Sequence, residues 1–370
     1  MKKRRHCDII ARKLTLQPGE VGAEEYFLKS TEDPVCRDSR NKESEEEMRS
    51  GKLLPEELRD SIFGIVGSRR KEVVQGVGLA EDCAVLKTDG TLLLTTDPIT
   101  SASKNGGSLA IHVSANDIAA SGGEPVVALL SLIMPNSCDT EDVKEIMISA
   151  ESTAKKLNIE IAGGHTEFSS AVNRPVISCT MLGVRNAFAT DGKLEPGDAI
   201  LMTKFAGLEA TAIAANDYAD KLSEVLSENE LEEARNMIDM ISVLPESRAL
   251  AETDITFMHD ITEGGVFGAV CEMCISQDLG AVIDAESIPV HYITKKICDK
   301  LGLNPYKMLS SGSMLIATPD EKAVKAILRK EGILCTTIGR ITTGDTVAKY
   351  KDRTEVIRVE SDEINKLENI

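Results

Sequence analysis

Acidic side chains occur at three separated points between residues 76 and 125, each beside glycines or other small residues. They are Glu81 with Asp82, then Asp97, and then Asp117. Mg²⁺ prefers carboxylate oxygens and commonly shares its coordination shell with water and substrate phosphates. Carboxylates brought together from three elements could therefore hold Mg²⁺ and a triphosphate. The alternative is that each is a solvated surface group, which is the usual state of an acidic side chain.

Two short strands are predicted to position the first two acidic points. Residues 83–87 and 91–96 are largely apolar and β-branched, and Asp89-Gly90 between them predicts a hairpin turn. Pro98 lacks a backbone donor and restricts the residue before it, so we expect the second strand to end there. Asp97 would then lie at the end of a strand.

A helix from about residue 105 to residue 121 is predicted to carry the third acidic point. Ala110, Ser114, Asp117 and Ser121 recur at helical spacing and share one face. Small residues on that face would let a bulky ligand approach, and Asp117 could then reach it. The glycines and the proline that follow predict the end of the helix.

A glycine pair also precedes a histidine and a glutamate. Residues 159–162 predict a strand that leads into Gly163 and Gly164, where the backbone could approach a ligand closely. His165 and Glu167 would project near such a ligand. Alternatively, His165 is a hydrogen-bonded structural histidine, since histidine is often half-buried.

A second glycine pair begins a helix in the C-terminal half. Asp260 and Glu263 precede Gly264 and Gly265, and the predicted helix reaches about residue 276. Backbone N–H groups at a helix N-terminus bind anions, and the two carboxylates lie beside them. The alternative reading is ordinary helix capping by Asp260 or the nearby threonine.

Composition limits the classes of function. The net charge of −18 argues against a broad nucleic-acid or anionic-membrane surface. The longest apolar run, residues 126–134, is too short to span a membrane. We therefore expect a cytoplasmic protein with neither kind of partner. Cys271 and Cys274 have CxxC spacing, but no second pair accompanies them, so buried reduced thiols are favoured over a zinc site.

Several motifs, in this order, resemble those of the AIR synthetase (PurM-like) superfamily. They are GLAEDCAVL, TLLLTTDPIT, AIHVSANDIAASGGEPV, IEIAGGHTE, HDITEGGV, and SSGS followed by MLIAT. The resemblance covers about residues 53–349. Within the superfamily, the motifs are most similar to those of the hydrogenase maturation factor HypE and HypE-like AIR synthase-related proteins.

The resemblance implies an α+β fold with two domains. An N-terminal α/β domain, residues 51–190, would provide the strands of a homodimer interface, with ATP near it. An α+β domain at residues 191–350 and a tail at residues 351–370 would follow. Residues 1–50 have sparse apolar residues and an acidic run, so we expect a disordered or loosely attached extension.

In the superfamily that this chain resembles, ATP phosphorylates an amide-type oxygen with the help of Mg²⁺. The resemblance implies that the metal ligands are Asp82, Asp97 and Asp117. The residues around the nucleotide would be those three with Glu81, Asn116, Gly163, Gly164, Gly264 and Gly265. The residues that orient the acceptor or move its protons would be His165, Glu167, Asp260 and Glu263.

Two alternatives stay open. The protein could be a non-catalytic nucleotide-binding assembly protein of metalloenzyme maturation. The basic run at residues 69–71 could contact a triphosphate or be a solvated loop.

The C-terminus departs from the HypE pattern. HypE proteins resemble one another in carrying a near-terminal cysteine, whereas the last cysteine here is Cys335, in a predicted buried strand. We therefore expect the acceptor to be a separate small molecule or another protein's side chain.

Overall fold

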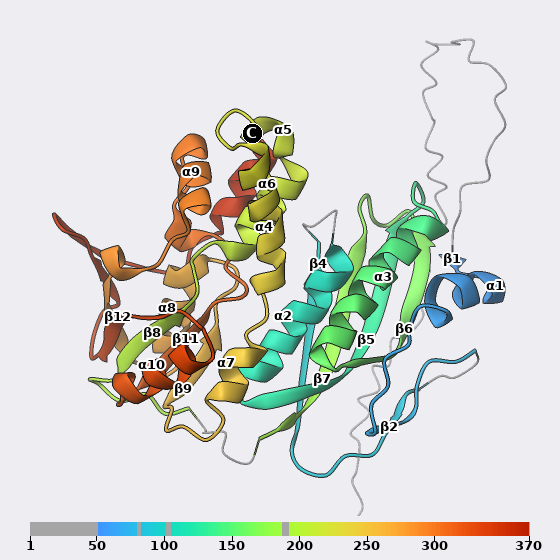
Figure 1. Cartoon of the computed structure of the whole chain (residues 1–370), viewed down its shortest axis with the longest axis horizontal. Helices are drawn as coiled ribbons and strands as arrows, with labels where there is room; N and C mark the ends of the chain where they lie inside the picture. The colour runs from blue at the N-terminus through green and yellow to red at the C-terminus, as the bar shows by residue number, and fades with distance from the viewer. Residues whose placement is uncertain (1–50, 80–82, 101–104, 187–191, 370) are drawn as a thin grey trace, which may run out of the picture. The chain divides into compact units, whose positions relative to one another are not determined.

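The computed structural model describes residues 51–79, 83–100, 105–186 and 192–369 (Figure 1). All the described residues belong to one compact unit, residues 47–370. The predicted extension, Glu81 and Asp82 lie outside the described residues. Helices and strands both build this unit, in agreement with the predicted α+β class.

A five-stranded sheet forms the N-terminal half, in the order β1-β6-β5-β7-β4. Strands β5 and β6 are parallel, and the other neighbours are antiparallel. Two helices, α2 (Gly106–Ala120) and α3 (Thr140–Leu157), lie side by side on one face of this sheet (Figure 1). The strands are β1 (Gly51–Lys52), β4 (Leu92–Ile99), β5 (Gly123–Pro135), β6 (Glu160–Ser169) and β7 (Val176–Arg185).

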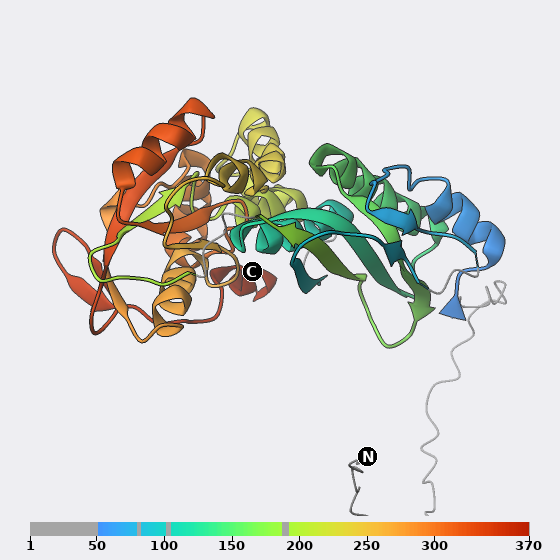
Figure 2. The same ribbon diagram turned by 90° about the horizontal axis from the view of Figure 1, so that it is seen from below.

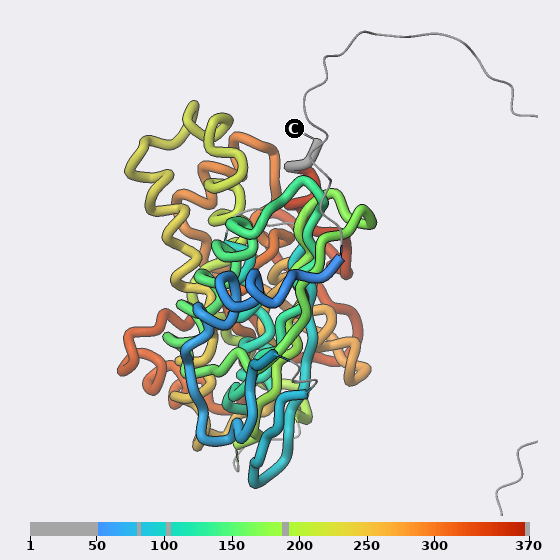
Figure 3. The backbone as a smooth tube through the Cα atoms, turned by 90° about the vertical axis from the view of Figure 1, so that its right-hand side faces the viewer, coloured from blue at the N-terminus to red at the C-terminus, as the bar shows by residue number. Residues whose placement is uncertain are grey.

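A small hairpin packs on the other face of this sheet. It consists of β2 (Val73–Gln75) and β3 (Val85–Leu86), whose side chains contact Val127 and Ala162. Before it, α1 (Pro55–Leu58) and a π-helical turn (Arg59–Phe63) belong to the blue tube that runs beside the green strands in Figure 3. The predicted hairpin of residues 83–87 with 91–96 is wrong, because β3 pairs with β2 whereas β4 pairs with β7.

A seven-stranded sheet forms the C-terminal half, in the order β14-β13-β10-β12-β8-β11-β9. Alternate residues of β8 and β11 enter different apolar cores, so the sheet is covered on both faces. Figure 2 shows α8 and α10 on opposite sides of these strands. The strands are β8 (Ala199–Thr203), β9 (Phe257–Asp260), β10 (Gly280–Asp284), β11 (Met314–Thr318), β12 (Cys335–Thr342), β13 (Val347–Lys349) and β14 (Thr354–Val356).

Helices of the C-terminal half cover this sheet and build a third apolar cluster. The α-helices are α4 (Leu208–Asp217), α5 (Ala219–Leu222), α6 (Glu228–Arg235), α7 (Leu244–Ala249), α8 (Gly265–Ile275), α9 (Tyr292–Leu301) and α10 (Glu321–Lys330). The 3₁₀ segments are η2 (Asn236–Met240), η3 (Ala285–Ser287), η4 (Pro305–Lys307) and η5 (Glu363–Asn369). None of the described helices is long and apolar enough to cross a membrane.

Two strands extend further than the sequence predicts. Pro98 does not end β4 but pairs with Ser178 inside it, which is possible because β4 is an edge strand of the sheet. Strand β6 continues through Gly163, Gly164 and the residues after them, so this segment is part of the sheet.

The acidic composition of residues 218–248 favours a helical and mostly exposed stretch. It is helical, but many of its side chains are buried. Leu222, Met237 and Leu244 belong to apolar cores, and Glu246 is fully buried. The many acidic residues of this stretch lower its average hydrophobicity, so its buried apolar residues are not evident from composition.

Candidate functional site

Thr95 links the carboxylates of Asp97 and Asp117. Strand alternation turns Thr95 and Asp97 towards α2, and both are half-buried. The Thr95 hydroxyl donates a hydrogen bond to Asp117 Oδ2 and lies 3.4 Å from Asp97 Oδ2. Ser114 Oγ, one turn before Asp117 on α2, lies 3.5 Å from Asp97 Oδ2. Helix α2 and strand β4 therefore bring two of the three predicted metal ligands together.

The proximity of these two carboxylates makes their doubly charged state costly. Burial raises the pKa of Asp117 to about 6, the Thr95 hydrogen bond opposes the rise, and the Asp97 charge adds to it. A proton or a cation would relieve the repulsion. Mg²⁺ in phosphate sites is commonly held by one or two carboxylates plus substrate oxygens, so this pair fits that ion. Across the described residues, no group of three or more His, Cys, Asp or Glu side chains could hold a metal ion by itself.

Asp260, at the end of β9, lines a pocket together with Thr95 and Asp117. This pocket has a volume of about 380 Å³. Asp260 is 4% exposed, and its Oδ2 has no hydrogen-bond partner among the described residues. Burial raises the pKa of Asp260 to about 7, with the charges of Asp117 and Asp97 acting in the same direction. Acids predicted for the metal side and the acceptor side thus meet in one pocket.

Helix α8 begins at the predicted glycine pair, but a carboxylate of the protein already lies there. Gly264 N–H donates to Asp362 Oδ2 at 2.7 Å, and Gly265 N–H donates to the Thr262 carbonyl at 3.1 Å. Glu263 is exposed, and its charge lies close enough to affect the pKa of Asp362. The predicted ligand contact of Gly264 is therefore made by Asp362 instead.

Two family models match the sequence in consecutive segments. The N-terminal domain of "AIR synthase related protein" matches residues 80–185, and the C-terminal domain of the same family matches residues 195–351. The chain belongs to the AIR synthase-related family. The predicted two-domain PurM-like fold is confirmed by this match and by similarity to solved HypE structures.

Proteins related to this AIR synthase-related chain have names from hydrogenase maturation. A Methanocaldococcus jannaschii protein assigned by name to hydrogenase expression and formation is 29% identical over 293 residues, which are 75% of this chain and 83% of that protein. "Carbamoyl dehydratase HypE" of Cupriavidus necator is 27% identical, over 60% of this chain and 63% of that protein. A crystal structure of HypE in complex with ATP has a TM-score of 0.65 at 20% identity, covering 77% of this chain and 89% of that chain.

In this AIR synthase-related chain, His165 and Glu167 lie away from the acidic pocket. His165 pairs in register with Ser131, Ser131 with Ser178, and Ser178 with Pro98. Cross-strand partners share a face, so His165 lies on the face opposite Thr95 and Asp97. His165 Nε2 and Glu167 Oε2 are 3.2 Å apart, and both side chains are exposed. Within one chain, the structure therefore separates this pair from Asp260.

The face of the five-stranded sheet opposite α2 and α3, which we call the open face, holds a larger pocket. Its volume is about 600 Å³, and its lining includes Gly163, Gly164, His165 and Leu94. Gly164 has φ +149°, and a Cβ there would lie 1.8 Å from the Leu130 carbonyl oxygen, so only glycine fits this position. That glycine is explained by strand packing without a ligand.

Asn116, predicted to support the nucleotide, holds the two halves of the chain together. It is fully buried; its Nδ2 donates to the Ile241 carbonyl at 2.8 Å, and its Oδ1 accepts from Val243 N–H at 2.9 Å. Ser247 Oγ donates to the Ala119 carbonyl at 2.8 Å. Successive residues of α2 thus point to different neighbours, Asp117 to the pocket and Asn116 to the C-terminal half.

Glu209 is an acidic residue of the site region that sequence reasoning missed. It lies in the first turn of α4, is 3% exposed, and its Oε2 has no partner among the described residues. Burial raises the pKa of Glu209 to about 7, which the adjacent Ser311 opposes. A charged residue alone within the apolar run Leu208–Ala215 was the signal that could have identified it.

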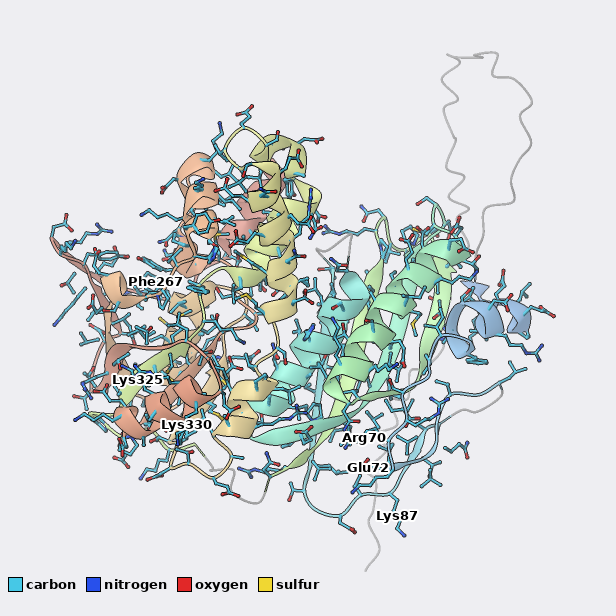
Figure 4. The ribbon with its side chains drawn as sticks, in the orientation of Figure 1. Arg70, Glu72, Lys87, Phe267, Lys325 and Lys330 are labelled. Carbon is cyan, nitrogen blue, oxygen red and sulfur yellow. The ribbon has the colours of Figure 1, made fainter. Side chains whose placement is uncertain are left out.

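Arg70 of the predicted basic run is held by protein groups, and the two cysteines of the CxxC pair are buried. Arg70 lies beside Glu72 (Figure 4), with Nε 3.1 Å from Glu72 Oε2, and donates to the Asn158 carbonyl at 2.7 Å. Cys271 and Cys274 are buried free thiols on α8, and burial raises the pKa of both.

Proposed function

We propose that this AIR synthase-related protein binds Mg²⁺ and ATP at Asp97 and Asp117 and transfers the terminal phosphoryl group to an acceptor. The acceptor would present an amide-type or similar oxygen, on a small molecule or on another protein. One observation carries the proposal: Asp117, which Thr95 links to Asp97, shares a pocket with the buried Asp260. The relative named carbamoyl dehydratase and the HypE structure with ATP support it.

Each acidic residue would have a distinct role. When bound, Mg²⁺ would neutralise charge on the transferred phosphoryl group. Asp97 and Asp117 would hold the ion, with the Thr95 hydroxyl fixing the orientation of both carboxylates. Asp260 would hold or accept a proton at Oδ2, the atom that has no hydrogen-bond partner within the described part of the chain. Asp82 and Glu81 would complete the metal and nucleotide site.

The open face of the N-terminal sheet would form a homodimer interface. Leu94 is 68% exposed and Leu129 is 38% exposed on this face. Exposed apolar side chains on a sheet face favour burial against another surface. His165 and Glu167 would then lie at this interface rather than at the acceptor in their own chain.

Calorimetry with Mg²⁺ and a non-hydrolysable ATP analogue tests the nucleotide site. Asp117→Asn should weaken binding at least about tenfold, or about 1.4 kcal/mol, because a ligand charge is lost. Asp142→Asn, on the exposed first turn of α3, is the matched control and should leave binding unchanged. Equal affinity of folded Asp117→Asn and wild-type protein would contradict the assignment.

Phosphate release separates an enzyme from an assembly protein. Purified protein with Mg²⁺, ATP and a panel of small amides should release phosphate in an acceptor-dependent way. Tight analogue binding without any release would instead favour a non-catalytic role in hydrogenase maturation.

A further inference from the structure

Lys204 directly follows β8, and its largely buried ammonium group lies against three oxygen atoms. Its Nζ lies 2.7 Å from the Ser242 carbonyl oxygen, 2.7 Å from the Gly312 carbonyl oxygen and 2.8 Å from Glu246 Oε1. The Lys204 side chain is 15% exposed and that of Glu246 is fully buried. The ammonium group therefore donates to two carbonyl groups and pairs with one carboxylate, and these acceptors come from two segments, residues 242–246 and Gly312.

The backbone of Lys204 adopts a conformation uncommon for lysine. Its φ is +51°, in the left-handed region that residues with a side chain rarely occupy. Such a conformation persists where the surroundings impose it. The contacts of the ammonium group on one side and of the following turn on the other provide that restraint.

The turn after Lys204 binds the loop at residues 309–313 along its length. Phe205 accepts a hydrogen bond at its carbonyl from Ser313 Oγ at 2.7 Å, Gly207 N–H donates to Ser310 Oγ at 2.6 Å, and Ala210 N–H donates to the Leu309 carbonyl at 3.1 Å. Together with the Lys204 contact to Gly312, these bonds fix the 309–313 loop on β8 and α4.

The 309–313 loop in turn holds the segment that carries Asp260. Ile261 N–H donates to the Ser313 carbonyl at 2.9 Å, and Ser310 N–H donates to the Thr262 carbonyl at 3.4 Å. Asp260 pairs in register with Met314, directly after the loop. A displacement of the loop would therefore displace Asp260.

On its other side, Lys204 contacts the segment that anchors α2. Ser242, whose carbonyl binds Lys204 Nζ, lies between Ile241 and Val243, the two residues bound by the Asn116 amide. Asn116 is the neighbour of Asp117 in α2. Hydrogen bonds and the short backbone segments between them thus connect α2, through residues 241–243, Lys204 and the 309–313 loop, to the segment that carries Asp260.

We propose that Lys204 is a positioning residue that couples nucleotide binding at Asp117 to the placement of Asp260. This inference rests on the proposed nucleotide site. A buried ion pair often adds little net stability, because desolvation offsets the attraction. Its role here is to join the Ser242 carbonyl, next to the residues that bind Asn116, to the Gly312 carbonyl, in the loop before the partner strand of Asp260.

Hydrogen exchange with and without Mg²⁺ and a non-hydrolysable ATP analogue tests the coupling. In wild-type protein the analogue should slow exchange of the Ile261 and Ser313 amides at least about fivefold, the lower range of coupling between sites. The variant Lys204→Met with Glu246→Gln removes both charges, so that no unpaired charge stays buried. It should bind the analogue as wild type does, but without this slowing.

Two further variants control the experiment. Lys300→Met with Glu224→Gln removes an exposed ion pair of similar length, 2.7 Å, and should keep the slowing. Asn116→Ala breaks the same set of hydrogen bonds at α2 and should lose it, which provides a second test should the Lys204 variant fail to fold.

Each outcome bears on one of the two proposals. A folded Lys204 or Asn116 variant that binds the analogue and retains the slowing would overturn the coupling role. Analogue binding by wild-type protein without any slowing would overturn it as well. Absence of binding to wild-type protein by calorimetry would contradict the nucleotide site itself, and the coupling with it.

Discussion

Glu209 is buried near a second acidic residue, Asp362. The Asp362 charge lies close enough to raise its pKa further, and burial has the largest effect. The pKa of about 7 in the folded state lies above the ordinary value of 4.5. Its charged form is therefore disfavoured by folding, so the stability of the fold is greatest when Glu209 is protonated.

The pH dependence of unfolding should report this group. Stability linked to Glu209 is complete below about pH 4.5 and is lost as the pH rises through about 7. Glu209→Gln stays neutral, so its unfolding free energy should fall less between about pH 5 and about pH 8, by on the order of 2 kcal/mol. Chemical denaturation across this range measures the difference.

An exposed glutamate provides the comparison. Glu228→Gln, at the exposed start of α6, should follow the wild-type pH dependence. A Glu209→Gln profile parallel to that of wild type would mean that Glu209 is already charged in the folded protein at low pH.

At the scale of elements, local signals predicted helix α2 well and strand pairing poorly. The small-residue face and the following glycines placed α2 within about a residue of its ends. Asp89-Gly90 is a local turn signal, but β4 pairs with β7, whose residues lie about eighty to ninety positions later in the sequence. Local sequence does not indicate which apolar strand will pair with which other strand.

The same limit applies to the site. Asp97, Asp117 and Asp260 could be chosen from residue type and position at the ends of elements. The separation of His165 from them could not, because it depends on which face each residue of β6 occupies. That register includes an irregularity between Ala128 and Leu129, and one inserted residue exchanges the two faces.

Strand β12 makes Cys335 a poor nucleophile. Burial raises the pKa of its thiol to about 12, so little thiolate exists at neutral pH. Cys83, by contrast, is exposed. Native-state alkylation followed by peptide mass analysis should modify Cys83 at least about tenfold faster than Cys335. Rapid modification of Cys335 would reopen a role for it as an acceptor thiol.

At the scale of the molecule, the open face of the N-terminal sheet predicts association. Leu94→Glu places a charge in the proposed interface and should weaken the homodimer at least about tenfold in light scattering after gel filtration. Leu334→Glu changes an exposed apolar residue of the C-terminal half and should leave the molar mass in solution equal to that of the wild-type dimer. A monomeric wild-type protein at micromolar concentration would contradict the proposed dimer.

Asn116 has a consequence for recombining this protein with its relatives. The apolar core around α2 includes Ile241, Val243 and Leu244, so the packing unit does not end where the N-terminal family match ends. A chimera joined near residue 190 would set an α2 from one parent against a 241–248 segment from another. Chimeras should therefore fold reliably only when residues 241–248 and α2 come from the same parent, although the two segments are not contiguous in the sequence.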